Sequence, residues 1–134
     1  MPSFLSPLLR DSSHPHRLVN ERTGQVVAEH LISAFDSKTR RTGLLAHTTF
    51  PAGSAMIIAP TNAIHTFFMK FAIDVLFVAK DGRIVKVREA LGPWRMAAAW
   101  RAYGVIELAA GALERSGVQR GDRLVIVQSG TAPA

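Results

Sequence analysis

The 134-residue chain contains no cysteine, and this absence removes several kinds of chemistry at once. Disulfide bonds, thiol nucleophiles, iron–sulfur clusters and cysteine-bound zinc are all excluded. The chain also lacks a run of about 18 apolar residues, so we expect no membrane-spanning segment. No basic stretch precedes the short apolar segment near the N-terminus, which predicts a cytoplasmic chain without a signal peptide.

Motifs of the common enzyme classes are missing as well. The sequence has no H-E-x-x-H motif, no glycine-rich phosphate loop, no G-x-S-x-G elbow and no dinucleotide fingerprint. His14 and His16 form an H-P-H pair, but two histidines are too few for a metal site. We therefore expect no metal, no cofactor and no assignable catalytic residue.

The composition is that of one globular domain, with 48% hydrophobic and 19% charged residues. Lys and Arg number 16 against 10 Asp and Glu, a formal charge of +6. Because these cations are spread along the chain, nucleic acid is the weaker expectation, and a small ligand or a protein is the expected partner.

We divide the chain into a flexible N-terminal arm (1–16), a single domain (17–128) and a C-terminal tail (129–134). The domain's turn signals and short apolar runs predict an α+β fold that is mostly β, a small partly closed barrel or rolled sheet with two short helices. Gly24 and the pair Asp81-Gly82 mark the two predicted hairpins. The predicted strands are Arg17–Asn20, Gln25–Glu29, Leu31–Phe35, Ser54–Ala59, Ala63–Phe71, Ile73–Ala79, Ile84–Glu89, Val105–Leu108 and Arg123–Gln128. The predicted helices are Ser37–Thr42 and Ala112–Ser116.

Polar side chains interrupt residues 59–78, the densest run of β-branched and aromatic residues in the chain. His65, Lys70 and Asp74 stand there, with Thr66 and Met69 beside them. A carboxylate can orient an imidazole for acid–base work, and a lysine can stabilise an anion. The alternative is a structural role, in which Asp74 accepts backbone hydrogen bonds or pairs with a cation such as Lys70 or Arg41.

A second group combines aromatic rings with arginines. Trp94, Trp100 and Tyr103 lie close in sequence to Arg95 and Arg101. Such rings can stack on a base, a sugar or a partner's side chains, or they can close one end of a barrel.

For two further acids, Glu107 and Asp122, we predict a structural role. Glu107 stands between residues expected to be buried, so an arginine partner is expected, with Arg41 a reasonable candidate. Asp122 follows Gly121, where an aspartate in a turn accepts hydrogen bonds from nearby amides.

Seven short motifs, in order and covering roughly residues 28–128, resemble the DUF192 family (also called UPF0127), a group of small bacterial and archaeal domains. They are Arg41-Thr42-Gly43-Leu44-Leu45, Phe68-Met69-Lys70, Ile73-Asp74-Val75-Leu76-Phe77, Asp81-Gly82-Arg83-Ile84-Val85, Pro93-Trp94, Val105-Ile106-Glu107-Leu108-Ala109-Ala110-Gly111 and Gly121-Asp122. The chain departs from the family at Phe68, where tryptophan is usual, at Leu45, where methionine is usual, and at Ala109, where proline is usual.

The resemblance implies a compact β-rich domain of uncharacterised biochemical role and supplies no catalytic residue. It also implies relatives with export or lipoprotein signals, whereas we expect no such signal in this chain. Our leading hypothesis is a non-enzymatic binding or accessory module with a polar pocket near His65 and Asp74. The alternatives are a small acid–base enzyme using those two residues and a basic nucleic-acid-binding domain. The candidate binding residues are His65, Thr66, Met69, Lys70, Asp74, Arg41 and Trp94.

Overall fold

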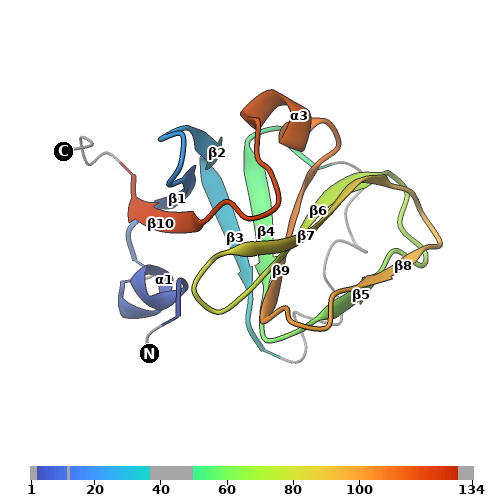
Figure 1. The fold of residues 1–134 in the computed structure, drawn as a ribbon, viewed down its shortest axis with the longest axis horizontal. Helices are drawn as coiled ribbons and strands as arrows, with labels where there is room; N and C mark the ends of the chain where they lie inside the picture. The colour runs from blue at the N-terminus through green and yellow to red at the C-terminus, as the bar shows by residue number, and fades with distance from the viewer. Residues whose placement is uncertain (1–2, 12, 37–49, 130–134) are drawn as a thin grey trace.

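The computed structural model describes residues 3–11, 13–36 and 50–129, whose strands form three sheets (Figure 1). The five-stranded sheet, in the order β3-β4-β9-β6-β7, consists of β3 (His30–Ala34), β4 (Ser54–Ile58), β9 (Gly104–Ala109), β6 (Ile73–Val78) and β7 (Ile84–Leu91). The three-stranded sheet, in the order β10-β1-β2, consists of β10 (Leu124–Gln128), β1 (His16–Asn20) and β2 (Val26–Ala28). The two-stranded sheet pairs β5 (Ala63–His65) with β8 (Met96–Ala98). The helices described are α1 (Ser6–Arg10) and α3 (Ala112–Ser116).

The mostly β fold with two short helices is confirmed, but the expected partial closure into a barrel is wrong. The described strands divide among three sheets that do not close, and β3 and β7 remain the two edges of the largest one. The error has a physical cause. Strands β4, β6 and β9 are buried along almost their whole length, and such strands occur in barrels and in sheets covered on both faces alike.

Two cores cover the two faces of the five-stranded sheet. On one face Ile57, Leu76 and Ile106 pack with side chains of the three-stranded sheet, α1 and α3, forming the first core. On the other face Met56, Val75, Phe77 and Val105 form the second core, together with Met69, Leu91 and Ala97. Successive strand residues point to opposite faces, so each central strand supplies both cores.

Both predicted hairpins are present. β1 pairs antiparallel with β2 around Gly24, and β6 pairs antiparallel with β7 around Asp81-Gly82. The second turn is not type I′, because only Gly82 (φ +92°) among its residues has positive φ. A Cβ on Gly82 would lie 2.3 Å from the Leu124 carbonyl oxygen, so the close approach of β10 also requires glycine here.

The N-terminal segment differs from the flexible arm expected for residues 1–16. Residues 6–10 form α1, and Phe4, Leu5 and Leu8 are buried in the first core. The Phe4 N–H also donates to the Lys80 carbonyl at 2.8 Å. Pro7 lies in the first turn of α1, where proline is tolerated because that N–H has no helical partner.

The predicted strand Ala63–Phe71 is shorter in the structure, because β5 ends at His65. The helix predicted over Ser37–Thr42 lies outside the described residues. Among the residues that are described, no helix is both long and apolar enough to cross a bilayer.

Candidate functional site

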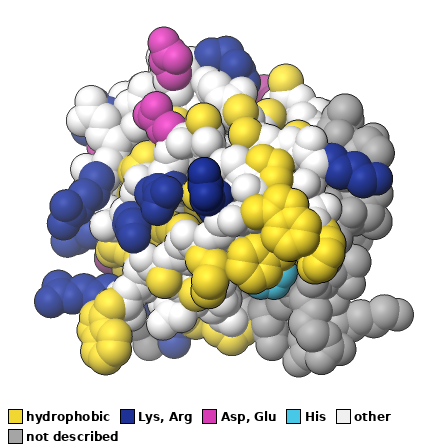
Figure 2. Space-filling model, turned by 90° about the vertical axis from the view of Figure 1, so that its right-hand side faces the viewer, with side chains coloured by type: hydrophobic (Ala, Val, Ile, Leu, Met, Phe, Trp, Pro, Cys, Tyr) yellow, Lys and Arg dark blue, Asp and Glu magenta, His cyan; other side chains and the backbone are white. Residues whose placement is uncertain are grey.

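A cluster of exposed side chains, most of them rings, lies beside the two-stranded sheet. We call it the aromatic tip and define it as His65, Phe67, Phe68, Trp94 and Met96. β5 carries His65 at its end, and β8 begins with Met96 directly opposite in the register. The sheet lies at the end of the long axis that is remote from β1 and β10 (Figure 1), and Figure 2 shows apolar side chains gathered around a histidine on this end.

The tip exposes much apolar surface for a folded domain. Phe68 is 68% exposed, Trp94 58% and Met96 69%. Exposed large apolar side chains that lie together are typical of contact surfaces, because a monomer gains no burial from them.

The rings of the tip stack on one another. The ring centroids of His65 and Phe67 are 4.8 Å apart, and those of Phe67 and Trp94 are 5.9 Å apart, both pairs being stacked. Phe68 lies against Trp94 at 4.6 Å with a 59° tilt. Trp94 therefore contacts two phenylalanine rings, one in a stacked and one in a tilted arrangement.

Two of the exposed rings are carried by strained backbone. Phe68 has φ +67° and Trp94 φ +63°, a left-handed conformation that bulky side chains rarely adopt. Such strain costs on the order of 1–3 kcal/mol per residue and is found preferentially at functional sites. The fold thus holds these two rings outward at a cost in stability.

Thr66 ties together the two loops that carry the rings. It is fully buried, and its carbonyl accepts hydrogen bonds from the N–H groups of Met69 (3.1 Å) and Trp94 (3.0 Å). Its N–H donates to the Arg95 carbonyl at 2.8 Å. Its hydroxyl donates to the Gly92 carbonyl at 2.6 Å and accepts from the Arg95 N–H at 2.8 Å. Thr66 therefore holds the loops of Phe68 and Trp94 together through both its side chain and its backbone.

The structure brings five of the sequence-predicted binding residues into this region, with different exposures. His65 and Trp94 are exposed members of the tip, whereas Thr66 and Met69 are buried beneath it. Lys70 is exposed in the same loop as Met69. The His65 Nδ1 accepts a hydrogen bond from the Phe67 N–H at 3.3 Å, so the neutral ring carries its proton on Nε2. Arg41 lies outside the described residues.

Asp74 has its hydrogen-bond partners elsewhere. It is 1% exposed, and its Oδ1 accepts from the Ala90 N–H at 2.8 Å. Its Oδ2 accepts from the N–H groups of Gly111 and Leu113, both at 3.0 Å. These two amides open α3, which has no side-chain cap of its own, so Asp74 caps that helix from a neighbouring strand. Strand alternation places Asp74 on the face of Leu76, toward the first core, whereas the two-stranded sheet packs on the second.

The aromatic residues Trp94, Trp100 and Tyr103, which are close in sequence, lie in different places in the structure. Trp94 joins the aromatic tip, and Trp100 is 91% exposed in the loop after β8. Tyr103 instead packs against the first core, with the Lys80 ammonium 5.7 Å from its ring centre.

Glu107 is a buried carboxylate in the middle of the five-stranded sheet. It is 5% exposed, and its register neighbours Met56 and Val75 are apolar. Its Oε2 has no hydrogen-bond partner among the residues that the structure describes. Burial raises the pKa of this carboxyl to about 7. The partner suggested from sequence, Arg41, is outside the described residues.

Asp122 organises the turn before β10. Its carboxylate accepts from Asn20 Nδ2 at 2.8 Å, from Arg22 Nε at 2.6 Å and from the Gln119 N–H at 2.9 Å. The Arg22 guanidinium hydrogen-bonded to it lowers the pKa of this carboxyl to about 2, despite the opposing effect of burial. The turn is therefore joined to the β1–β2 hairpin through a charged side chain.

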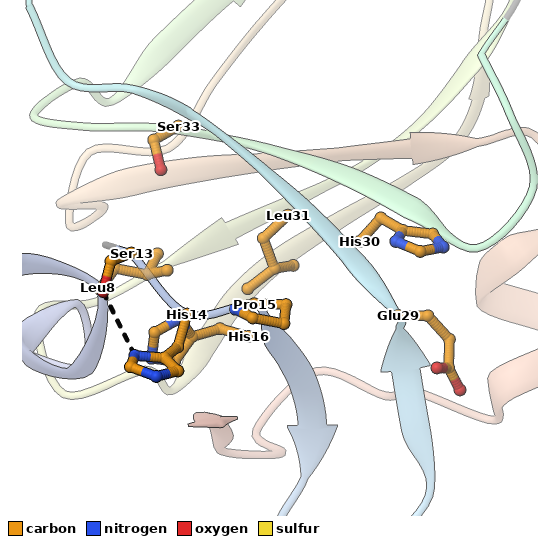
Figure 3. Close-up of a pocket in the computed structure, with 9 residues that line it drawn as sticks. All are labelled: Leu8, Ser13, His14, Pro15, His16, Glu29, His30, Leu31 and Ser33. Carbon is orange, nitrogen blue, oxygen red and sulfur yellow. Dashed lines mark hydrogen bonds between the residues drawn. The ribbon is translucent and has the colours of Figure 1, made fainter. Parts of the chain in front are cut away.

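A separate cavity of about 430 Å³ lies between the N-terminal segment and β3, lined by His14, His16 and His30 among others (Figure 3). His14 Nδ1 lies 2.6 Å from an oxygen of Asp11. Figure 3 shows His30 well apart from the other two histidines. In the described parts of the chain, no group of three or more His, Asp or Glu side chains is arranged to hold a metal ion.

Sequence reasoning missed three members of the tip, namely Phe67, Phe68 and Met96. The strand predicted over Ala63–Phe71 includes Phe67 and Phe68 in its interior. The signal that could have revealed them is the mixed character of both faces of Ala63–Phe71, which a regular strand does not explain.

Comparison with known proteins matches most of the chain to an uncharacterised family. The model of DUF192, described as "Uncharacterized ACR", matches residues 18–126. A solved structure from Sinorhizobium meliloti, described as a "putative transcription regulator", has a TM-score of 0.70 at 26% identity and covers 83% of this chain and 91% of its own. A Novosphingobium aromaticivorans protein of unknown function also has a TM-score of 0.70, at 20% identity, covering 82% of each chain. No curated protein matches the sequence.

Proposed function

This chain belongs to the DUF192 family, and we propose that it is a non-enzymatic binding module whose contact surface is the aromatic tip. The observation that carries the proposal is the combination of exposure and strain at Phe68 and Trp94. Both rings are more than half exposed, and both backbones are left-handed. A fold that bears this cost without burying the rings itself leaves them available to a partner.

The rigidity of the tip also supports binding. Thr66 holds the two loops through hydrogen bonds at 2.6–3.1 Å, and the rings are stacked in the free protein. A surface that is ordered before it meets its partner loses less conformational entropy on binding. Aromatic side chains are moreover the residues that most often dominate binding energy at interfaces.

An acid–base enzyme using His65 and Asp74 receives less support. Such a mechanism needs the two side chains within hydrogen-bond reach, directly or through one water. The described hydrogen bonds of Asp74 go instead to three backbone amides, and that of His65 Nδ1 goes to Phe67. For this reason we propose that Asp74 anchors the fold and does not contact a ligand.

A nucleic-acid-binding function is also less well supported. The Sinorhizobium relative carries a regulator description, yet part of the ring surface at the tip is taken up by the stacking of His65 on Phe67 and of Phe67 on Trp94. A base needs a free ring face on which to stack. We therefore propose contact through the exposed parts of the rings and the apolar side chains around them.

Tryptophan fluorescence can test the proposed surface directly. The chain has two tryptophans, so the variant Trp100→Phe leaves Trp94 as the sole tryptophan reporter. We would screen metabolites, oligosaccharides, peptides, oligonucleotides and lipid vesicles for a shift in the emission of this variant. A ligand of the tip should shift the emission maximum to shorter wavelength, because binding removes the half-exposed indole from water.

The matched control is Trp94→Phe, which leaves Trp100 as the reporter outside the tip. Any ligand that binds the tip should lose at least about tenfold in affinity in Phe68→Ala/Trp94→Ala, because two buried rings each contribute more than 1 kcal/mol. A ligand that binds the chain equally well with and without these rings would contradict the proposal. Turnover of any compound in the screen would do the same.

A further inference from the structure

We propose that the partner of the aromatic tip is the surface of an anionic lipid bilayer, into which the tip inserts. This inference rests on the proposed binding function and specifies its partner. It is carried by the shape, the chemistry and the charge of one end of the molecule.

The position of the tip suits contact with a plane. The two-stranded sheet forms one end of the long axis, while β1, β10 and α1 lie toward the other end (Figure 1). The contact surface is thus an end of the molecule on which apolar side chains stand outward, and a flat apolar medium can receive several of them together.

The side chains of the tip are those that partition into membrane interfaces. Tryptophan and phenylalanine concentrate at the boundary between headgroups and acyl chains, where an amphipathic or apolar ring leaves water. Trp94, Phe68 and Met96 are the three most exposed apolar side chains of the tip. The exposed parts of these rings can enter lipid whichever way they face, because insertion requires no free ring face.

Positive charge accompanies the apolar side chains. Lys70 and Arg95 are exposed in the same two loops that carry Phe68 and Trp94. Figure 2 shows further Lys and Arg side chains on this end, whereas the acidic side chains lie toward its top and edges. Basic residues beside inserted rings attract the headgroups of anionic lipids, and this attraction extends over roughly one Debye length.

Sedimentation with lipid vesicles tests the inference. The whole chain is mixed with vesicles of phosphatidylcholine and phosphatidylglycerol in equal parts, and in parallel with vesicles of phosphatidylcholine alone. We expect the protein to sediment with the anionic vesicles and much less with the neutral ones. In the variant Phe68→Ala/Trp94→Ala, partitioning should fall by at least about tenfold, because two rings no longer leave water.

Two controls are matched to the rings and to the charges. Leu9→Ala removes a 66% exposed apolar side chain on α1, toward the other end of the molecule, and should leave partitioning unchanged. Lys70→Glu/Arg95→Glu should weaken partitioning more than Arg10→Glu/Arg120→Glu does, although both pairs change the net charge equally and all four residues are exposed. Circular dichroism and the melting temperature of each variant show whether it is folded.

Insertion itself has a separate readout. In the Trp100→Phe variant, lipids brominated near the headgroup end of the acyl chain should quench Trp94 emission, and the emission should shift to shorter wavelength. In Trp94→Phe, the remaining Trp100 should be quenched less.

Three results would overturn the inference: no sedimentation with anionic vesicles, undiminished sedimentation of folded Phe68→Ala/Trp94→Ala, or equal effects of the two charge-reversal pairs. A different outcome is that the protein fails to bind vesicles but binds a peptide, an oligosaccharide or an oligonucleotide, with lower affinity in Phe68→Ala/Trp94→Ala. In that case the bilayer is the wrong partner, and the proposed binding function is retained. If no ligand of any class depends on these rings, both proposals fail.

Discussion

The carboxylate of Asp74 shows how one side chain can anchor three segments. It lies at the start of β6, yet its three hydrogen bonds go to the backbone of β7 and to the first amides of α3. Ala90, which donates one of these bonds, has φ +50°. A bonded carboxylate therefore holds a strained strand residue and an otherwise uncapped helix together.

Replacing Asp74 by asparagine should destabilise the protein by about 2–4 kcal/mol, because an amide nitrogen would then face backbone donors. Urea-induced unfolding followed by circular dichroism measures the change. Asp81→Asn is the matched control, since Asp81 accepts one backbone bond in an exposed turn, and it should cost less than about 1 kcal/mol. Equal losses of unfolding free energy in the two variants would show that the three hydrogen bonds of Asp74 add no stability beyond a single exposed one.

At the scale of elements, strand β9 carries Glu107 between two apolar residues, Met56 on β4 and Val75 on β6. Glu107 has no hydrogen-bond partner for its Oε2 among the described residues, and burial raises its pKa from 4.5 to about 7. A raised folded-state pKa means that folding favours the protonated form. Stability is then fully present below about pH 4.5 and declines as the pH rises toward 7.

The expected decline is roughly 3 kcal/mol, since each pKa unit corresponds to about 1.4 kcal/mol. Glu107→Gln should abolish it, so the difference in unfolding free energy between wild type and variant should change by that amount between about pH 4.5 and 7.5. Urea titrations at several pH values measure this difference. Glu114→Gln, an exposed acid on α3, should give a difference nearly independent of pH. Parallel curves for wild type and Glu107→Gln would contradict a raised pKa.

The turn elements were the most predictable from sequence, because their residues have local requirements. Gly24 and Gly82 both adopt positive φ, and both hairpins form where these residues predicted them. The loops of the tip were not predictable in this way. Positive φ at Phe68 and Trp94 goes against the preference of the residues themselves, and distant bonds to Thr66 help to impose it.

At the scale of the whole molecule, the two cores explain where sequence reasoning about the fold failed. A strand buried on both faces has the same apolar pattern in a barrel as in a sheet covered by other layers. The pattern therefore does not distinguish the two architectures, and only the structure identifies the layers that cover the sheet. The candidate site shows the same limit. His65, Thr66 and Trp94 were named from sequence, but nothing local to residue 94 indicates which rings lie beside it.

The N-terminal segment is a testable part of the first core. Leu5→Ala should destabilise the protein by about 2–4 kcal/mol, because Leu5 is only 2% exposed and a cavity would remain. Leu9→Ala, on the same helix but 66% exposed, should change stability by less than about 0.5 kcal/mol. Thermal unfolding of both variants gives the comparison, and a neutral Leu5→Ala would mean that α1 can detach from the fold.

The pairing of β1 with β10 has a consequence for how the chain acquires its structure during synthesis. The first strand finds its antiparallel partner more than a hundred residues later, between His16 and Gln128. Until the ribosome has released β10, β1 can pair only with β2, and the face of the five-stranded sheet that carries the first core is incompletely covered. We therefore expect the first core to be completed in a late step that joins β1 to β10.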